Sequence, residues 1–418
     1  MEMRSIVKLA GLALTSVSLF TASPVVIAAE IAENNHVQIG GLIQTDFAGF
    51  GGQSDAGSRW ETDFNGGGDF RRVEFAIKGN IIDHWNYQIA YDVDDSEWDD
   101  SWLGYGGFEP LWLAVGRLSI PQGLENWNAS SALQFMERAP VADAFSPPES
   151  GIGFYGEGTT GLVGYAAGFV FPDHNEQDNA VDGEFADSDP WSAGGRLTIA
   201  PINMQENVHE VLHFGGSYYY QNVDSNQWFS GLAARPGIAI RNAPALVESV
   251  ATGPINDPVA GSVDHTQVWG LETAGIWGPL SAQAEYEKYY LYGDNGYGNL
   301  TFDGWYAQAG YVLTGESRSY FKESGTFGNV SPRSKMGAWE VAVRYAHLDL
   351  TDTGALWAEP EDDDSNRGKQ DDWTLGLNWY VNDNVKFQFN YVRSEADYST
   401  STPDRTVDVY AVRAQVRF

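Results

Sequence analysis

Residues 373–392 read WTLGLNWYVNDNVKFQFNYV, and this stretch decides the fold class. Its apolar side chains recur at every second position, first at 373, 375, 377, 379 and 381 and then at 385, 387, 389 and 391. Successive side chains of a β-strand point to opposite faces, so this spacing predicts two half-buried strands. Only Asn382-Asp383-Asn384 separates them, which predicts a tight antiparallel hairpin.

The same spacing recurs along most of the chain and predicts about sixteen strands, an even count that is typical of outer-membrane barrels. Their spans are 36–50, 69–80, 85–94, 101–108, 111–119, 151–159, 162–171, 191–200, 210–222, 265–277, 280–291, 301–314, 337–350, 371–381, 384–397 and 406–418. Short connections, such as 81–84, 109–110, 160–161, 278–279 and 382–384, alternate with long ones at 51–68, 120–150, 172–190, 223–264, 351–370 and 398–405. The connection 315–336 is long where a short turn is expected. One end of the sheet therefore carries short turns and the other end carries long loops, as in outer-membrane barrels.

The N-terminus has the pattern of an export signal. Arg4 and Lys8 precede an apolar stretch at 9–20, and Ala28 and Ala29 offer a cleavage point. We therefore expect a signal peptide over 1–29 and one barrel domain over 30–418. The 418-residue chain has no cysteine and a formal net charge of −33. An acidic chain is unsuited to a nucleic-acid partner, whose phosphates need a basic surface.

Two features favour a membrane barrel over a water-soluble sandwich, which has the same alternation. Aromatic residues lie at strand ends, as in the girdles at a membrane interface: Trp85, Tyr91, Trp269, Trp277, Trp305, Trp339, Trp373 and Trp379. The last predicted strand ends on the terminal Phe418, which fits a final strand that pairs with the first. The predicted fold is all-β: a sixteen-stranded antiparallel transmembrane β-barrel in the Gram-negative outer membrane.

Residues 120–150 form the predicted constriction loop. At this length a connection is functional or disordered, and its apolar side chains argue against disorder. A barrel of about sixteen strands has a bore too wide for wall side chains to fill. We expect the loop to fold into the bore and narrow it, with a surface cap over one end of the sheet as the alternative.

Alternation also assigns the inward-facing charges, because an arginine or lysine facing lipid at mid-membrane costs roughly 2–4 kcal/mol. Arg72, Glu74 and Lys78 are predicted to face the lumen, whereas Arg71 has lipid-side parity and is expected at a strand end or in a subunit contact. Further inward cations are Arg196, Arg344, Lys386, Arg413 and Arg417, and inward acids are Asp92, Glu272, Glu285 and Glu287. Whether such charges select ions or only solvate the wall stays open.

No signal for another class of function is strong. The seven histidines are scattered, and no catalytic or phosphate-cradling motif occurs, so we predict no enzyme, no cofactor and no metal site. A closed structural or adhesive barrel remains the alternative from another class.

The segment DFRRVEFAIKGNIIDHWNYQIAYDV at 69–93 resembles the phosphate-selective porin O and P family. The resemblance continues through GRLSIPQGLENW, SSALQFMERA, WYAQAGYVLTGESR and GAWEVAVRY. It implies a sixteen-stranded outer-membrane porin that forms a homotrimer and has its third loop inserted into the pore. Members of the family also have a long turn after the LTGE motif, which accounts for the long connection 315–336.

The family also implies an arginine-lined pore for anions. Arg71 and Arg72 match its Phe-Arg-Arg piece, Arg138 matches the Glu-Arg pair of the inserted loop, and Arg235 and Arg241 fall in the fifth outer loop. The family's constriction lysine is replaced by Asn126, which brings no charge. The predicted pore-lining set is Arg71, Arg72, Lys78, Arg117, Asn126, Arg138, Arg196, Arg235, Arg241 and Arg344. We expect passive diffusion of small hydrophilic solutes and ions, with or without a preference for anions. The alternative is a channel selective for phosphate or polyphosphate.

Overall fold

The structure is a computed structural model. It describes residues 27–32, 35–51, 66–147, 151–172, 191–204, 209–223, 231–239, 245–249, 263–293, 298–352, 367–399 and 403–418. Most of the expected signal segment and residue Arg241 lie outside these ranges.

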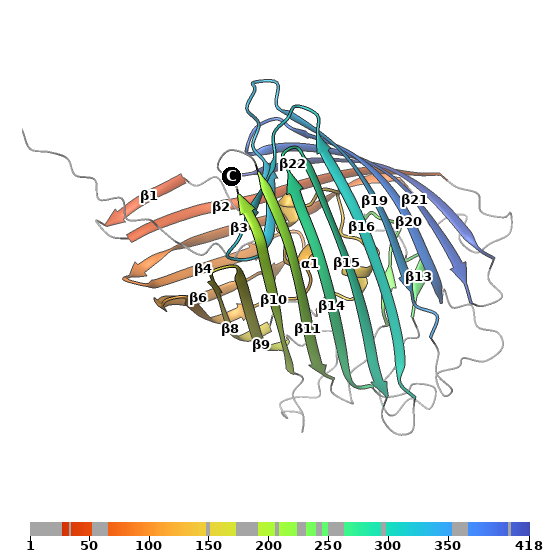
Figure 1. Cartoon of the computed structure of the whole chain (residues 1–418), viewed down its shortest axis with the longest axis horizontal. Helices are drawn as coiled ribbons and strands as arrows, with labels where there is room; N and C mark the ends of the chain where they lie inside the picture. Colours follow the sequence, from red (N-terminus) through yellow and green to blue (C-terminus); the bar gives the residue numbers. More distant parts are fainter. Residues whose placement is uncertain are drawn as a thin grey trace, which may run out of the picture.

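Sixteen strands of the described chain form a closed antiparallel barrel (Figure 1). They are β2 (Asn35–Gly51), β3 (Gly67–Ile82), β4 (Trp85–Asp92), β6 (Ser101–Phe108), β7 (Leu111–Leu118), β8 (Gly151–Thr160), β9 (Val163–Pro172), β10 (Trp191–Met204), β11 (Glu210–Asn222), β14 (Val263–Trp277), β15 (Leu280–Gly293), β16 (Leu300–Val312), β19 (Ala338–Asp349), β20 (Gly368–Tyr380), β21 (Val385–Tyr398) and β22 (Arg405–Arg417). Each pairs with its neighbour in sequence, and β22 pairs back with β2, with Leu42 opposite Arg417. The predicted fold class is confirmed.

Alternation along the strands separates an apolar outside from a polar inside. On β20, Trp373 and Leu375 are 54% and 53% exposed, whereas Thr374 between them is fully buried. Closure matters because backbone groups in hydrocarbon need partners inside the protein. None of the helices in the described ranges is long and apolar enough to span a bilayer.

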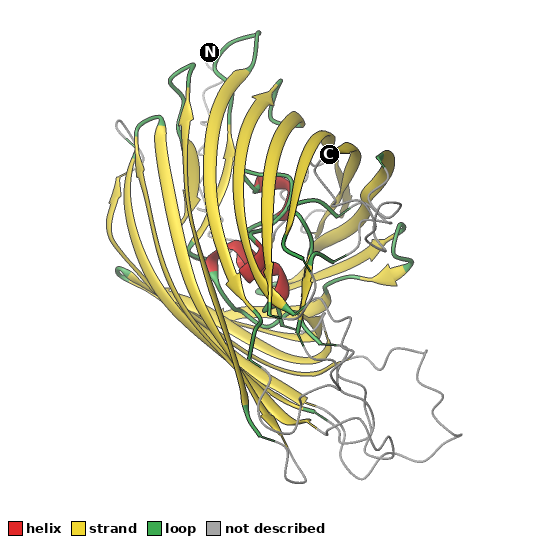
Figure 2. Cartoon of the chain, turned by 90° about the vertical axis from the view of Figure 1, so that its right-hand side faces the viewer, coloured by secondary structure: helices red, strands yellow, loops and turns green. Residues whose placement is uncertain are grey.

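The remaining elements are short. They are β1 (Ile27–Ala32), β5 (Glu97–Trp98), β12 (Ala233–Ala234), β13 (Val247–Glu248), β17 (Arg318–Phe321), β18 (Thr326–Val330), α1 (Leu124–Trp127), η1 (Ser130–Ala132) and α2 (Pro140–Ala144). Strand β1 pairs with β2, whereas β12 pairs with β13 and β17 with β18. The helices belong to the connection between β7 and β8, and Figure 2 shows them within the ring of strands.

Candidate functional site

The connection between β7 and β8 supplies part of the buried core. Leu124, Phe135, Met136, Val141 and Phe145 are at most 1% exposed, although they belong to a loop. Its polar groups bond to inward side chains of the wall, so the loop is fixed to strands far from it in sequence.

One attachment lies on β15. The carboxylate of Glu285 accepts hydrogen bonds from the backbone amides of Leu124 and Glu125, both at 2.7 Å, and Gln122 donates to Glu287 at 3.0 Å. Gly123 has φ +62, and a Cβ there would lie 2.8 and 2.9 Å from oxygens of Glu285 and Glu287. Glycine is therefore the residue that lets the loop approach this wall.

A second attachment lies on β19, β21 and β22. Arg344 donates to Glu125 Oε1 at 3.3 Å and to the carbonyl of Glu137 at 3.0 Å. Lys386 Nζ donates to the carbonyls of Ser131 and Leu133 at 2.9 and 3.1 Å, and Arg413 donates to the carbonyl of Met136. These wall cations bind loop carbonyls, and Arg344 and Arg413 are at most 1% exposed.

Glu137 joins the loop to β3 and β22, the two strands that flank β2. Its carboxylate pairs with Arg71 at 3.0 Å on β3 and with Arg413 at 2.5 Å on β22. Burial opposes ionisation of Glu137, but the combined charges of Arg71, Arg413 and Arg72 hold its pKa well below the usual range.

Arg71 points inward because of a bulge in β3. Gln44 is opposite Arg72 and Thr45 is opposite Phe70, so Arg71 is an extra residue in the ladder. A bulge re-aims the side chain it carries. Strict alternation had placed Arg71 on the lipid side, at a strand end or in a subunit contact. That expectation is wrong: the side chain is bonded to the loop.

The long turn between β16 and β19 also enters the barrel. Arg196 on β10 donates to the carbonyls of Ser324 and Gly325 at 2.7 and 2.9 Å and pairs with Glu272 at 2.6 Å. Arg318 donates to the carbonyl of Ala132 at 2.9 Å. The hairpin β17–β18 is thus held by the wall on one side and by the β7–β8 loop on the other. Sequence reasoning marked this turn as unusually long but did not predict its insertion.

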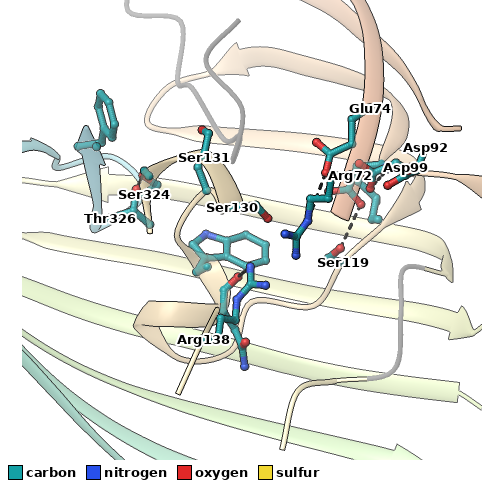
Figure 3. Close-up of a pocket in the computed structure, with 18 of the residues that line it drawn as sticks. Arg72, Glu74, Asp92, Asp99, Ser119, Ser130, Ser131, Arg138, Ser324 and Thr326 are labelled. Carbon is teal, nitrogen blue, oxygen red and sulfur yellow. Dashed lines mark hydrogen bonds and ion pairs between the residues drawn. The ribbon is translucent and has the colours of Figure 1, made fainter. Parts of the chain in front are cut away.

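A cavity of about 560 Å³ remains beside the loop. Strands β3, β4, β7 and β8 provide one side, and the loop and the β17–β18 hairpin provide the other. Four arginines line it: Arg72, Arg117, Arg138 and Arg417. Hydroxyl groups from both inserted segments also line it, and Figure 3 shows Ser130, Ser131, Ser324 and Thr326 among them.

Arg138 is held in the cavity by neutral groups. Its guanidinium donates to the backbone oxygens of Glu125, Asn126 and Asn128 at 3.2, 3.4 and 3.5 Å. Carbonyl acceptors orient the guanidinium without neutralising its charge. The side-chain amide of Asn126 donates to the carbonyl of Ala142 at 2.8 Å, so this residue serves the loop's own structure.

Carboxylates share the cavity with these arginines. Glu74, Asp92, Asp95, Glu97, Asp99 and Asp100 line it, mostly from the turn between β4 and β6. Glu74 lies 3.6 Å from Arg72, and Ser119 donates to Asp100 at 3.1 Å. Burial, reinforced by the charge of Asp99, raises the pKa of Asp100 to about 7. Burial likewise raises the pKa of Asp99.

The predicted pore residues divide into separate groups. Arg72, Arg117, Asn126 and Arg138 line the cavity. Arg196 and Arg344 are buried at the attachment points of the hairpin and the loop. Lys78 is half-buried on β3, and Arg235 lies beside β12, where its carbonyl accepts from Gln370 at 3.0 Å. Arg241 falls outside the described residues.

Sequence reasoning missed the hydroxyl and aromatic lining. Trp112, Trp127 and Tyr155 face the cavity, and Trp127 stacks on Tyr155 with ring centroids 5.9 Å apart. Ser130, Ser131 and Trp127 lie in the β7–β8 loop, where alternation gives no signal. Trp112 on β7 and Tyr155 on β8 have the buried parity of their strands, a signal that could have selected them. In the described ranges, no three histidine or acidic side chains are placed to hold a metal ion.

Comparison with known proteins gives consistent matches. Residues 37–418 match the model of a family described as phosphate-selective porin O and P. Porin O of Pseudomonas aeruginosa is 31% identical over 402 residues, which cover 91% of this chain and 88% of that protein.

Two solved structures share the fold at low identity. The trimer form of OmpT, an outer membrane protein of Vibrio cholerae, superposes with a TM-score of 0.53 at 10% identity, covering 92% of this chain and 100% of the other. An anion-selective porin from Comamonas acidovorans gives 0.50 at 11% identity, with the same coverage.

Proposed function

The chain belongs to the phosphate-selective porin O and P family and forms a channel in the Gram-negative outer membrane, and we propose that small hydrophilic solutes and ions cross it passively through the cavity beside the β7–β8 loop. The observation that carries the proposal is the cavity itself, about 560 Å³ of space inside a closed barrel, lined by charged and hydroxyl side chains. Such a lining keeps a path hydrated.

Arg72, Arg117 and Arg138 are the proposed anion-binding groups. A guanidinium attracts a unit negative charge by about 1 to 4 kcal/mol at ~4 Å, for effective dielectric constants from 80 to 20. Arg196 and Arg344 act instead by fixing the inserted segments, because their guanidinium groups bond to Glu272, to Glu125 and to backbone carbonyls.

Selective passage of phosphate is the second candidate. The family resemblance and the guanidinium groups of the cavity favour it. Asn126 weakens it, because that residue is neutral and its amide group is already bonded to Ala142.

The proposal also includes a cleaved export signal and assembly into a homotrimer. Cleavage after residue 29 would release the barrel domain. A homotrimer is supported by the solved trimer form of the Vibrio cholerae protein and by the lengths of β4, β6 and β7, which have eight residues each. Eight residues tilted by about 45° span only ~19 Å, less than an apolar band of ~25 Å, so contact with neighbouring subunits would relieve the mismatch.

Chloride conductance and its block by phosphate test these candidates. Purified protein in a planar bilayer should give discrete ohmic steps in potassium chloride. If phosphate blocks the chloride current and Arg138→Ala relieves the block, the selective reading holds. If phosphate does not block while Arg138→Ala changes conductance, general diffusion holds. Silence in repeated insertions contradicts both.

A further inference from the structure

Two buried carboxylates on β15 face the β7–β8 loop. Glu285 and Glu287 lie two positions apart on the inward face of the strand and are 4% and 0% exposed. Neither forms an ion pair within the described part of the chain, whereas Glu272, opposite Glu285 on β14, pairs with Arg196 at 2.6 Å. Burying an ionised carboxylate is unfavourable unless a positive group accompanies it.

The two carboxylates differ in their hydrogen bonds. Glu285 accepts from two backbone amides of the loop and from the hydroxyl of Tyr306, so both of its oxygens are bonded. Glu287 accepts one hydrogen bond, from Gln122 Nε2 to Oε2 at 3.0 Å, and its Oε1 has no partner among the described residues. Buried polar atoms nearly always have a partner in folded proteins. A further group is therefore expected at this oxygen.

Gln122 gives an independent sign that this group is a cation. Its side chain is fully buried, and its amide nitrogen is directed at Glu287. Its amide oxygen Oε1 nevertheless has no partner in the ranges that the structure describes. Carboxylate and amide oxygens can only accept hydrogen bonds, so the two unpaired oxygens cannot satisfy each other. A positive ion between them can satisfy both.

The loop backbone brings the oxygens together. A Cβ on Gly123 would lie 2.8 Å from Glu285 Oε2 and 2.9 Å from Glu287 Oε1, so both oxygens face the same point of the loop. The hydroxyl of Ser217 accepts from the amide of Gly123 at 3.2 Å and thus lies at the same turn. In the sheet, Gly270 is paired with Ser217 on one side and with Glu287 on the other, and it has no side chain to separate them.

The ligand set favours calcium. It consists of oxygen atoms only, from two carboxylates, one amide and one hydroxyl, and such ligands suit Ca²⁺ and Mg²⁺. Mg²⁺ demands a regular octahedron and keeps several waters, whereas Ca²⁺ accepts irregular arrangements of oxygens. Glu287 is fully buried, which leaves little room for a hydrated ion. A divalent charge also balances the two carboxylates that have no ion pair.

We propose that Glu285, Glu287, Gln122 and Ser217 form a calcium site that ties the β7–β8 loop to β11 and β15. The ion joins an amide of the loop to carboxylates of the wall and thereby holds the loop in place. This inference goes beyond the proposed function, because it concerns how the loop is fixed and holds whichever solute crosses the channel.

Calcium binding by the purified protein tests the inference. The full chain in detergent is stripped with a chelator and equilibrated with calcium chloride, and its bound calcium is measured by elemental analysis. The wild type should retain about one calcium ion per chain more than Glu287→Gln, which keeps the shape of the side chain and removes its charge. The control Glu395→Gln removes a 57% exposed carboxylate and should bind as the wild type does. Equal calcium content in the wild type and Glu287→Gln overturns the inference.

Thermal unfolding distinguishes a calcium site from a protonated carboxyl group. In the chelator, Glu287→Gln should unfold at a higher temperature than the wild type, because it removes a buried charge that has no partner. With calcium the order should reverse, since an ion that binds only the folded wild type stabilises it. If Glu287→Gln is the more stable protein under both conditions, Glu287 carries a proton and the inference fails.

A second variant makes the test independent of whether Glu287→Gln folds. Gln122→Met removes the amide oxygen without changing the charge of the site, and it should raise the half-saturating calcium concentration about tenfold. An unchanged concentration overturns the site. Failure of the porin function is a separate result, because calcium binding is measured in detergent and requires no current.

Discussion

Replacing Glu137 by glutamine should loosen the β7–β8 loop while keeping the shape of the side chain. Arg71 Nε and Nη2 contact this carboxylate at 3.0 and 3.2 Å, and Arg413 contacts it as well. Removing one partner of a buried ion pair costs about 3–5 kcal/mol. Arg413 keeps Asp46 at 2.7 and 2.6 Å, and Arg71 is 23% exposed, so we expect a smaller loss of roughly 2–3 kcal/mol.

That loss predicts a measurable change in the pore. At about 1.4 kcal/mol per factor of ten, the fraction of time the loop is detached should rise about 30- to 150-fold. Single-channel recording should show frequent excursions to a larger conductance. The matched control is Glu395→Gln, which removes a 57% exposed carboxylate paired with Arg393 at the surface and should change little. If Glu137→Gln and Glu395→Gln give the same conductance and noise, the loop is not held in this way.

Three further predictions follow from the same contacts. Gly123→Ala should lower the midpoint of thermal unfolding, because the new Cβ meets Glu285 and Glu287 at φ +62; Gly161→Ala, at φ +61 with open space around it, measures the backbone effect alone. Arg196→Met should expose the β17–β18 hairpin by removing the bonds to Ser324 and Gly325, and trypsin cleavage after Lys322 should rise about tenfold if ~1.4 kcal/mol is lost. Raising the pH from 5.5 to 8.5 should shift the reversal potential toward cations, because the Asp100 carboxyl loses its proton near pH 7 and adds a negative charge; Asp100→Asn should reduce that shift.

The wall of the barrel could be predicted from the sequence because it follows a local rule. Each strand faces lipid on one side and the interior on the other, so the period of two is present in every segment of the wall. Leu375 and Thr374 obey it directly. Arg71 breaks this rule, because one extra residue in the strand changes which face the side chains point to. The residue types around Arg71 give no sign of that extra residue.

The interior could be predicted only in part because its contacts are long-range. Parity correctly gives Arg344 and Lys386 inward directions, but it cannot tell a side chain that meets water from one that meets loop carbonyls. That distinction depends on where residues 120–147 lie. The serines of the cavity come from two separate segments, and only their meeting inside the barrel makes them one surface.

The most direct test of the conducting path uses the chain's lack of cysteine. Ser130→Cys places one thiol in the cavity, and Val343→Cys places one on the outward face, where the side chain is 39% exposed. A water-soluble cationic thiol reagent added during single-channel recording should reduce chloride current through the Ser130→Cys channel in one step and leave the Val343→Cys channel unchanged. Full modification of Ser130→Cys, verified by mass, with no change in current would contradict the assignment of this cavity as the path.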